Sequence, residues 1–194
     1  GVDALGFIFF RKSPRCMTSE RAVSVIDTLP PFITKVGVFV DSDLATVRNT
    51  VEACGLNQVQ LHGKETPSFC LDLKKWRREL SICKAFRVGA ESPPVDVSSY
   101  SPVIDSVLLD TYVKGNEGGT GVSFDWSLID SLKLDRPLIL AGGLTPDNII
   151  DAVSSVRPYA VDINSGVEKS PGVKDHSALQ ELIGKIRKFE CGLL

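Results

Sequence analysis

An apolar run that ends in cations is the first place in this sequence where chemistry is expected. The segment "FFRKSPR" (9–15) passes directly from two phenylalanines to Arg11, Lys12 and Arg15 around a Ser-Pro turn. The planar guanidinium of an arginine donates two parallel hydrogen bonds to a carboxylate or a phosphate. We therefore expect Arg15 to bind an anion at the end of a strand, with a solvated surface arginine as the alternative.

Two glycine-containing segments nearer the C-terminus suggest a phosphate site. They are "AGGL" (141–144) and "DINSGVE" (162–168). If the two segments follow neighbouring strands, their backbone N–H groups converge on one anion, as between the last two loops of a (βα)8 barrel. The residues concerned are Gly142, Gly143, Ser165 and Gly166. The alternative is that the glycines only permit tight turns with positive φ, but the adjacency of two such loops favours phosphate.

Asp110 and His62 also follow apolar runs. A carboxyl group at a partly desolvated site can act as a general acid, and Asp110 ends the run "VLLD" (107–110). For an aspartate taken alone, a strand-end cap is the simpler explanation. His62 in "QLHG" (60–63) could stack on a substrate or hydrogen-bond to it, whereas a lone histidine more often satisfies a neighbouring loop carbonyl.

Seven short apolar runs must position these residues. The runs are continuous and do not alternate with polar residues, which is typical of strands covered on both faces. They cover residues 4–10, 35–40, 58–61, 82–86, 106–110, 138–143 and 160–166.

Helical patterns lie between most of these runs. Thr66 and Thr145 each precede a proline, which predicts a capped helix start at both places. An apolar stripe of helical period over 44–54 stops at Gly55, and a last helix is expected over 175–189. The segment 89–102 is too rich in proline and serine for a long helix.

Strands that alternate with helices predict a parallel sheet, either open and doubly wound or closed as a (βα)8 TIM barrel. Seven strands exceed the usual five of an open flavodoxin-like sheet, so the barrel is favoured, with one βα unit unaccounted for. Residues 1–194 contain no linker or repeat and are expected to form a single, N-terminally shortened domain. Both architectures bind ligands at the carboxyl ends of their strands, where all the candidate residues lie.

The composition narrows the function classes. The net charge is −2 with no long basic run, so we expect neither nucleic acid nor a membrane surface as a partner. The five cysteines are scattered without a CxxC pair, which predicts neither a disulfide framework nor a zinc site and fits a reducing cytoplasm. We expect no metal.

Six segments in order resemble the phosphoribosylanthranilate isomerase family over essentially the whole chain. They are "GVDALGFIFFRKSPR", "KVGVFV", "VQLHG", "LLDT" with "GGTGVSFDW", "LAGGLTPDNI" and "VDINSGVEKSPGVKD". The resemblance implies a (βα)8 barrel that acts in tryptophan biosynthesis. Its members convert N-(5′-phosphoribosyl)anthranilate to the 1-deoxyribulose phosphate by an Amadori rearrangement without a cofactor. A small phosphoribosyl substrate and a monomer or homodimer are expected.

The resemblance also assigns roles to residues. Asp110 becomes the general acid that protonates the furanose ring oxygen, so that the ring opens to an iminium. Arg15 becomes the group that holds the anthranilate carboxylate, and His62 lines that end of the pocket. The phosphate loops are matched by Gly142, Gly143, Ser165 and Gly166, and supporting roles at the same mouth fall to Asp162 and Asn164.

The family's first strand, of the type "KICG", carries the cysteine that acts as general base, and no such segment occurs in this sequence. The resemblance starts at the family's second strand, so we expect one βα unit of about 20–25 residues to be absent. Among the cysteines present, Cys16 lies nearest to the expected region. One alternative is a phosphosugar-binding barrel that has lost its base. Another is the sister enzyme indole-glycerol-phosphate synthase, whose catalytic lysine only Lys84 could supply.

Overall fold

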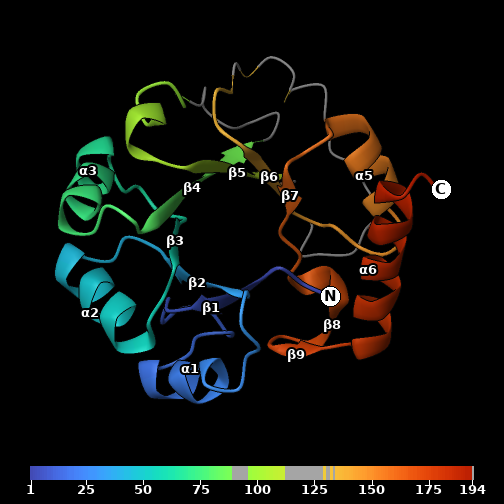
Figure 1. The fold of residues 1–194 in the computed structure, drawn as a ribbon, viewed down its shortest axis with the longest axis horizontal. Coiled ribbons are helices and arrows are strands. Elements are labelled where there is room, and N and C mark those ends of the chain that lie inside the picture. Colours follow the sequence, from blue (N-terminus) through green and yellow to red (C-terminus); the bar gives the residue numbers. More distant parts are fainter. Residues whose placement is uncertain (89–95, 112–128, 130–131, 133, 194) are drawn as a thin grey trace. The chain divides into compact units, whose positions relative to one another are not determined.

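A computed structural model describes residues 1–88, 96–111, 129, 132 and 134–193 of the chain (Figure 1). The segment 118–126 of the family resemblance lies outside the described residues. Contacts divide the chain into two units, of which the first comprises Gly1–Ala85 with Asp96–Val107. The second comprises Phe86–Val95 with Leu108–Leu194. Each unit is described by itself below.

The seven predicted strands are all present. They are β1 (Ala4–Ile8), β2 (Thr34–Phe39), β3 (Gln58–Leu61), β4 (Ser81–Val88), β5 (Ser106–Thr111), β6 (Leu138–Ala141) and β7 (Ala160–Val161). Strands β1 to β4 are neighbours in chain order, and so are β5 to β7. The pairs β1–β2, β2–β3, β3–β4 and β6–β7 are parallel, as continuous apolar runs predict. Strand β7 has only two residues, far fewer than the predicted 160–166.

The first unit places three helices along the outer face of β1–β4 (Figure 1). They are α1 (Ser19–Ile26), α2 (Leu44–Cys54) and α3 (Pro67–Trp76), and each starts at an N-cap whose side chain accepts a backbone N–H. Thr66 caps α3 as predicted, and Gly55 ends α2 with the predicted left-handed conformation, φ 57°. The described part of 89–102 contains only the short 3-10 helix η1 (Ser101–Val103), in agreement with its composition.

A parallel row of residues runs across this part of the sheet. Phe7 pairs with Gly37, Gly37 with Val59, and Val59 with Ile82. A side chain at Gly37 would collide with Leu56 and Phe39, because the sheet and its helical cover are tightly packed there. The buried residues of this core include Phe39, Val47, Val51, Val59, Leu61, Leu73 and Ile82.

The second unit contains α5 (Ile149–Val156) and α6 (His176–Glu190), which lie against each other. The loop after β7 forms the 3-10 helix η2 (Ser165–Val167) and an antiparallel hairpin of β8 (Glu168–Ser170) and β9 (Val173–Lys174). Asp175 caps α6, so the predicted last helix over 175–189 is confirmed within one residue.

The predicted capped helix start at Thr145 is wrong. Helix α5 begins at Ile149, three residues after the predicted first helical residue Pro146, and its N-cap residue Asn148 makes no side-chain cap. The reason is that Asn148 turns back towards the loop. Its Oδ1 accepts the N–H of Thr145 at 2.9 Å, and its Nδ2 donates to the carbonyl of Gly143 at 3.0 Å. The Asn148 side chain therefore shapes the glycine loop and leaves the helix end uncapped.

Candidate active site

Asp110 lies at the carboxyl end of β5, as predicted. The three residues before it, Val107, Leu108 and Leu109, are fully buried, whereas Asp110 itself is half-buried. A carboxyl group in this position is anchored by a rigid strand and still meets the solvent edge. This is the placement that a general acid at a strand end requires.

The loops after β6 and β7 are packed directly against each other. A Cβ atom at Gly166 would overlap the carbonyl oxygen of Leu144 and crowd Thr145. Gly166 is not among the glycines that adopt a positive φ, so close approach of the two loops, and not a turn conformation, requires a glycine here. The predicted adjacency of the two glycine loops is therefore present within the second unit.

Backbone N–H groups at this junction are available to an anion. Ser165 and Gly166 are the first residues of η2, so their N–H groups have no acceptor within that helix. No hydrogen bond from the Gly143 N–H is recorded among the described residues. A Cβ atom at Gly143 would meet nothing within 4 Å, so open space lies beside it. Together these donors can surround a phosphate.

The turn explanation also holds for part of the loop. Gly142 and Gly143 adopt φ of 90° and 61°, which residues with side chains rarely tolerate. These two glycines thus serve the turn whether or not an anion binds. The turn explanation does not apply to Gly166, because Gly166 has no positive φ and a glycine is required there by the contact with Leu144.

Asn164 is bound by a lysine side chain, whereas Asp162 is joined to the neighbouring strand through its backbone. Lys174 Nζ donates to both the carbonyl and the side-chain oxygen of Asn164, at 2.7 and 2.9 Å, and pairs with the largely buried Glu168 at 3.2 Å. Asn164 thereby ties the end of η2 to the hairpin. Asp162 is half-buried directly after β7, and its N–H donates to the Leu140 carbonyl at 2.8 Å.

In the first unit, the segment after β1 folds back on the strand. The N–H of Met17 donates to the Ile8 carbonyl, and the Ser13 hydroxyl oxygen accepts the N–H of Arg15 at 3.1 Å. Arg15 is half-buried, whereas Arg11 is exposed. The Ser-Pro turn therefore holds Arg15 near the carboxyl end of β1, where the sequence predicts an anion-binding group.

His62 follows β3 at the same edge of the first unit. The backbone N–H of His62 donates to the Phe39 carbonyl, and the ring Nε2 lies 2.7 Å from the side-chain nitrogen of Gln60. His62 is held by backbone and side chain together.

A buried ion pair lies beside this loop and was not predicted. Lys84 Nζ is 3.2 Å from Glu65 Oε2, and the two side chains are 3% and 2% exposed. The only signal in the sequence is a lysine in the middle of the apolar run 82–86. Lys84 also donates to three backbone carbonyls, so its amine is fully engaged and poorly suited to act as a nucleophile.

The five cysteines lie in different surroundings. Cys54, Cys70 and Cys83 are buried, Cys16 is half-buried and Cys191 is exposed. Burial raises the pKa of Cys70 to about 11, which keeps it a thiol at neutral pH. In the part of the chain that the structure describes, no group of three acidic, histidine or cysteine side chains could hold a metal ion.

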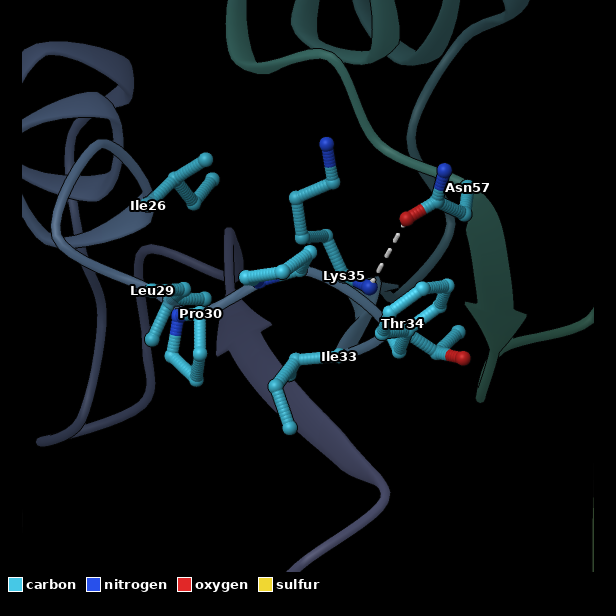
Figure 2. A pocket seen from close by; sticks show the side chains of 9 residues that line it. Ile26, Leu29, Pro30, Ile33, Thr34, Lys35 and Asn57 are labelled. Atoms are coloured by element: carbon cyan, nitrogen blue, oxygen red, sulfur yellow. Dashed lines mark hydrogen bonds between the residues drawn. The ribbon is translucent and has the colours of Figure 1, made fainter.

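Two cavities are described, and neither is at the strand ends that carry these residues. The larger, of about 420 Å³, lies at the amino end of β2, where Figure 2 shows Ile26, Leu29 and Ile33 around it and Lys35 bonded to Asn57. The smaller lies near the amino ends of β3 and β4. Ligands of parallel α/β folds bind at the carboxyl ends of the strands. We therefore assign the candidate site to the residues at those ends and not to the two cavities.

Comparison with known proteins identifies the family. The family model described as "N-(5'phosphoribosyl)anthranilate (PRA) isomerase" matches residues 1–185. The chain belongs to this family. The isomerase of Pseudomonas fluorescens (strain Pf0-1) is 47% identical over 187 residues, which cover 96% of this chain and 89% of the relative. The isomerase of Geobacter sp. (strain M21) is 46% identical, with 97% and 89% covered.

Solved structures agree. Phosphoribosyl anthranilate isomerase from Thermotoga maritima is 36% identical with a TM-score of 0.80, and the match covers 96% of this chain and 89% of that one. The enzyme from Thermus thermophilus is 33% identical with a TM-score of 0.81, covering 97% and 90%. A third structure, 35% identical with a TM-score of 0.76 (96% and 88% covered), holds reduced 1-(o-carboxyphenylamino)-1-deoxyribulose 5-phosphate. The predicted family and the (βα)8-barrel fold class are confirmed, and the described residues contain the seven predicted strands.

No helix among the described residues is both long and apolar enough to cross a membrane.

Proposed function

We propose that this protein converts N-(5′-phosphoribosyl)anthranilate to 1-(2-carboxyphenylamino)-1-deoxyribulose 5-phosphate, an isomerisation of tryptophan biosynthesis. Family membership over residues 1–185 carries the reaction. The contact of Gly166 with Leu144, which joins the two glycine loops, carries the site. The substrate supplies a phosphate, a sugar ring and a carboxylate, and each has a candidate partner at a strand end.

The phosphate of the substrate is proposed to bind between the loops after β6 and β7. The N–H groups of Gly143, Ser165 and Gly166 donate to its oxygens, as neutral donors at a tight turn and a helix start do in other anion sites. Gly142 sets the turn, and Asp162 and Asn164 support the loop from β7 and the hairpin.

The phosphate site predicts a loss of binding in Gly143→Val. A branched side chain would enter the open space beside Gly143 and would also strain a backbone with φ of 61°. We expect the dissociation constant for the reduced product analogue to rise at least about tenfold, because at least one charge-assisted contact is lost. Isothermal titration calorimetry measures this constant. Gly184→Val, at an equally unobstructed glycine of α6, serves as the control. Unchanged affinity in Gly143→Val would mean that these glycines serve the turn alone.

Asp110 is proposed to start the reaction as general acid. Its proton goes to the furanose ring oxygen, the bond between that oxygen and C1′ breaks, and the nitrogen lone pair forms an iminium. A base then removes the C2′ proton, and the resulting enol amine tautomerises to the ketose. By the family resemblance the base is a cysteine of the strand of the type "KICG", which is not among the cysteines of residues 1–194.

The resemblance to the family supplies the proposal for the anthranilate end of the substrate. Arg15 pairs with its carboxylate through a guanidinium fork, and His62 lines the pocket there. No cofactor or metal is proposed for the reaction, since proton transfers alone complete it.

Two other functions are less well supported. A phosphosugar-binding protein without catalysis would keep the acid and the anion sites and lack the base, so turnover by the enzyme that carries the family's first βα unit separates it from the isomerase. Indole-glycerol-phosphate synthase chemistry needs an available lysine, and Lys84 is instead enclosed by Glu65 and backbone carbonyls.

We propose a cytoplasmic homodimer in preference to a monomer. One solved relative, 33% identical with a TM-score of 0.75, is described as a monomer form of a dimeric isomerase. In this chain Phe32 is 99% exposed on the loop before β2, beside the larger cavity, and a second copy would cover it. Sedimentation velocity on the wild type and on Phe32→Asp tests this, since an unchanged sedimentation coefficient would exclude that surface.

A further inference from the structure

Lys84 and Glu65 form a buried ion pair that the proposed reaction does not use. Lys84 is in β4, and Glu65 precedes α3 in the loop after β3. Their charged atoms are 3.2 Å apart and almost wholly removed from solvent. Removing two charges from water costs several kcal/mol per ion, and apolar replacements of such pairs are often neutral or stabilising. Fold stability alone is therefore a weak explanation for this pair.

The ammonium of Lys84 holds the backbone on both sides of His62. Lys84 Nζ donates to the Leu61 carbonyl at 3.0 Å and to the Gly63 carbonyl at 2.8 Å. These are the residues immediately before and after His62. The Leu61 carbonyl belongs to the peptide group directly before His62, and the Gly63 carbonyl belongs to the second peptide group after it. Holding the backbone on both sides restricts the direction in which the Cα–Cβ bond of His62 points.

The carboxylate of Glu65 holds the same loop from the other side. It accepts the N–H of Gly63 at 2.9 Å and the N–H of Asp41, just beyond β2, also at 2.9 Å. Asp41 has the unusual φ of 51°, and its side chain accepts the N–H of Lys64. A Cβ atom at Gly63 would overlap Asp41, so the loop is pressed against the end of β2.

We propose that the Lys84–Glu65 pair is a positioning device for His62, and that it thereby sets the affinity for the anthranilate end of the substrate. This deepens the proposed function and rests on the role given there to His62. The pair acts through backbone atoms and touches no reacting group. Its loss should affect one end of the substrate and leave the other unchanged.

The test uses the enzyme that carries the family's first βα unit. The double variant Lys84→Met/Glu65→Gln removes both charges together, so no unpaired ion is left buried. The glutamine introduced by Glu65→Gln keeps an oxygen that can accept the N–H groups of Asp41 and Gly63. Lys74→Met is the matched control, because Lys74 is in the same unit and likewise pairs with a carboxylate, that of Asp105 at 2.6 Å.

We expect the double variant to raise KM for the substrate about tenfold, the worth of one hydrogen-bonded contact, with the inhibition constant of inorganic phosphate within about twofold of wild type. Lys74→Met should leave both constants unchanged. Adding His62→Ala to the double variant should cost little more than His62→Ala alone, since the two changes act through one contact. Parallel losses in KM and phosphate inhibition, or fully multiplicative effects, would overturn the proposal.

A second measurement does not depend on the substrate. The chain has two histidines, so the ring signal of His62 in a ¹H–¹³C spectrum is assigned by its persistence in His176→Asn. The double variant should shift this signal, and Lys74→Met should not. A KM unaffected by His62→Ala would refute the role of His62 in the proposed site, whereas an unshifted signal in the double variant would refute the positioning device itself. If the double variant does not fold, Glu65→Gln alone is held to the same shift.

Discussion

Arg15 is the residue whose charge the proposed site uses most directly. Arg15→Met keeps the apolar stem of the side chain and removes the guanidinium. We expect binding of the reduced product analogue to weaken by roughly 1.5–3 kcal/mol, about 10- to 150-fold, because a charge-assisted pair is lost. Inorganic phosphate should bind as before. Arg11→Met, at the exposed neighbouring cation, is the control by titration calorimetry. Equal losses for both variants would indicate a general charge effect.

At the residue scale, the sequence located strand-end residues well and side-chain partners poorly. Asp110 lies at the end of the buried strand β5 and His62 directly follows the buried strand β3, so their positions come from the apolar pattern alone. A glycine is required at position 166 because of its contact with Leu144. Leu144 is distant in the sequence, so no local sequence pattern predicts this contact. The same holds for Lys84, whose acceptors Leu61 and Gly63 lie at the end of the neighbouring strand β3 and in the loop after it.

At the scale of elements, the start of α6 depends on Asp175. Its carboxylate accepts the N–H groups of Ala178 and Ser177, and the Ala178 hydrogen bond is the main cause that lowers its pKa below the usual 3.8. A lowered folded-state pKa contributes stability above the unfolded pKa, and this stability is lost as pH falls through the folded value. The cap therefore weakens below about pH 4.

Asp175→Asn should consequently keep the cap and lose its titration. We expect its urea midpoint to fall less between pH 7 and pH 3 than that of the wild type, while Asp175→Ala is less stable already at pH 7. Asp151→Asn, at a residue in the first turn of α5, is the control. Parallel pH dependences of Asp175→Asn and wild type would show that the Asp175 carboxylate does not couple to folding.

Elements were predictable where one local signal dominates. The apolar runs gave all seven strands, and Thr66 and Gly55 marked helix ends correctly. The start of α5 was misplaced because Asn148 bonds back to the glycine loop, which a Thr-Pro pattern does not reveal. The hairpin β8–β9 was missed because strands of two or three residues carry too little periodicity.

At the scale of the whole molecule, a single domain stays a prediction, and cooperative unfolding tests it. Cys54, Cys70 and Cys83 are buried in the first unit, whereas α5 and α6 belong to the second. We expect labelling of these three thiols and the far-UV circular dichroism of the whole chain to change at one urea concentration. Without urea only Cys16 and Cys191 should react with a thiol reagent. Two separate transitions would instead indicate two independently stable parts.

The central claim is that this molecule catalyses the isomerisation with Asp110 as its general acid. The most direct test is the steady-state rate of Asp110→Asn in the enzyme that carries the family's first βα unit, with Asp151→Asn as control. We predict that kcat falls about 10²- to 10⁴-fold with little change in KM, because a general acid acts in the transition state. A raised KM with an unchanged kcat would contradict the account and make Asp110 a binding or structural residue.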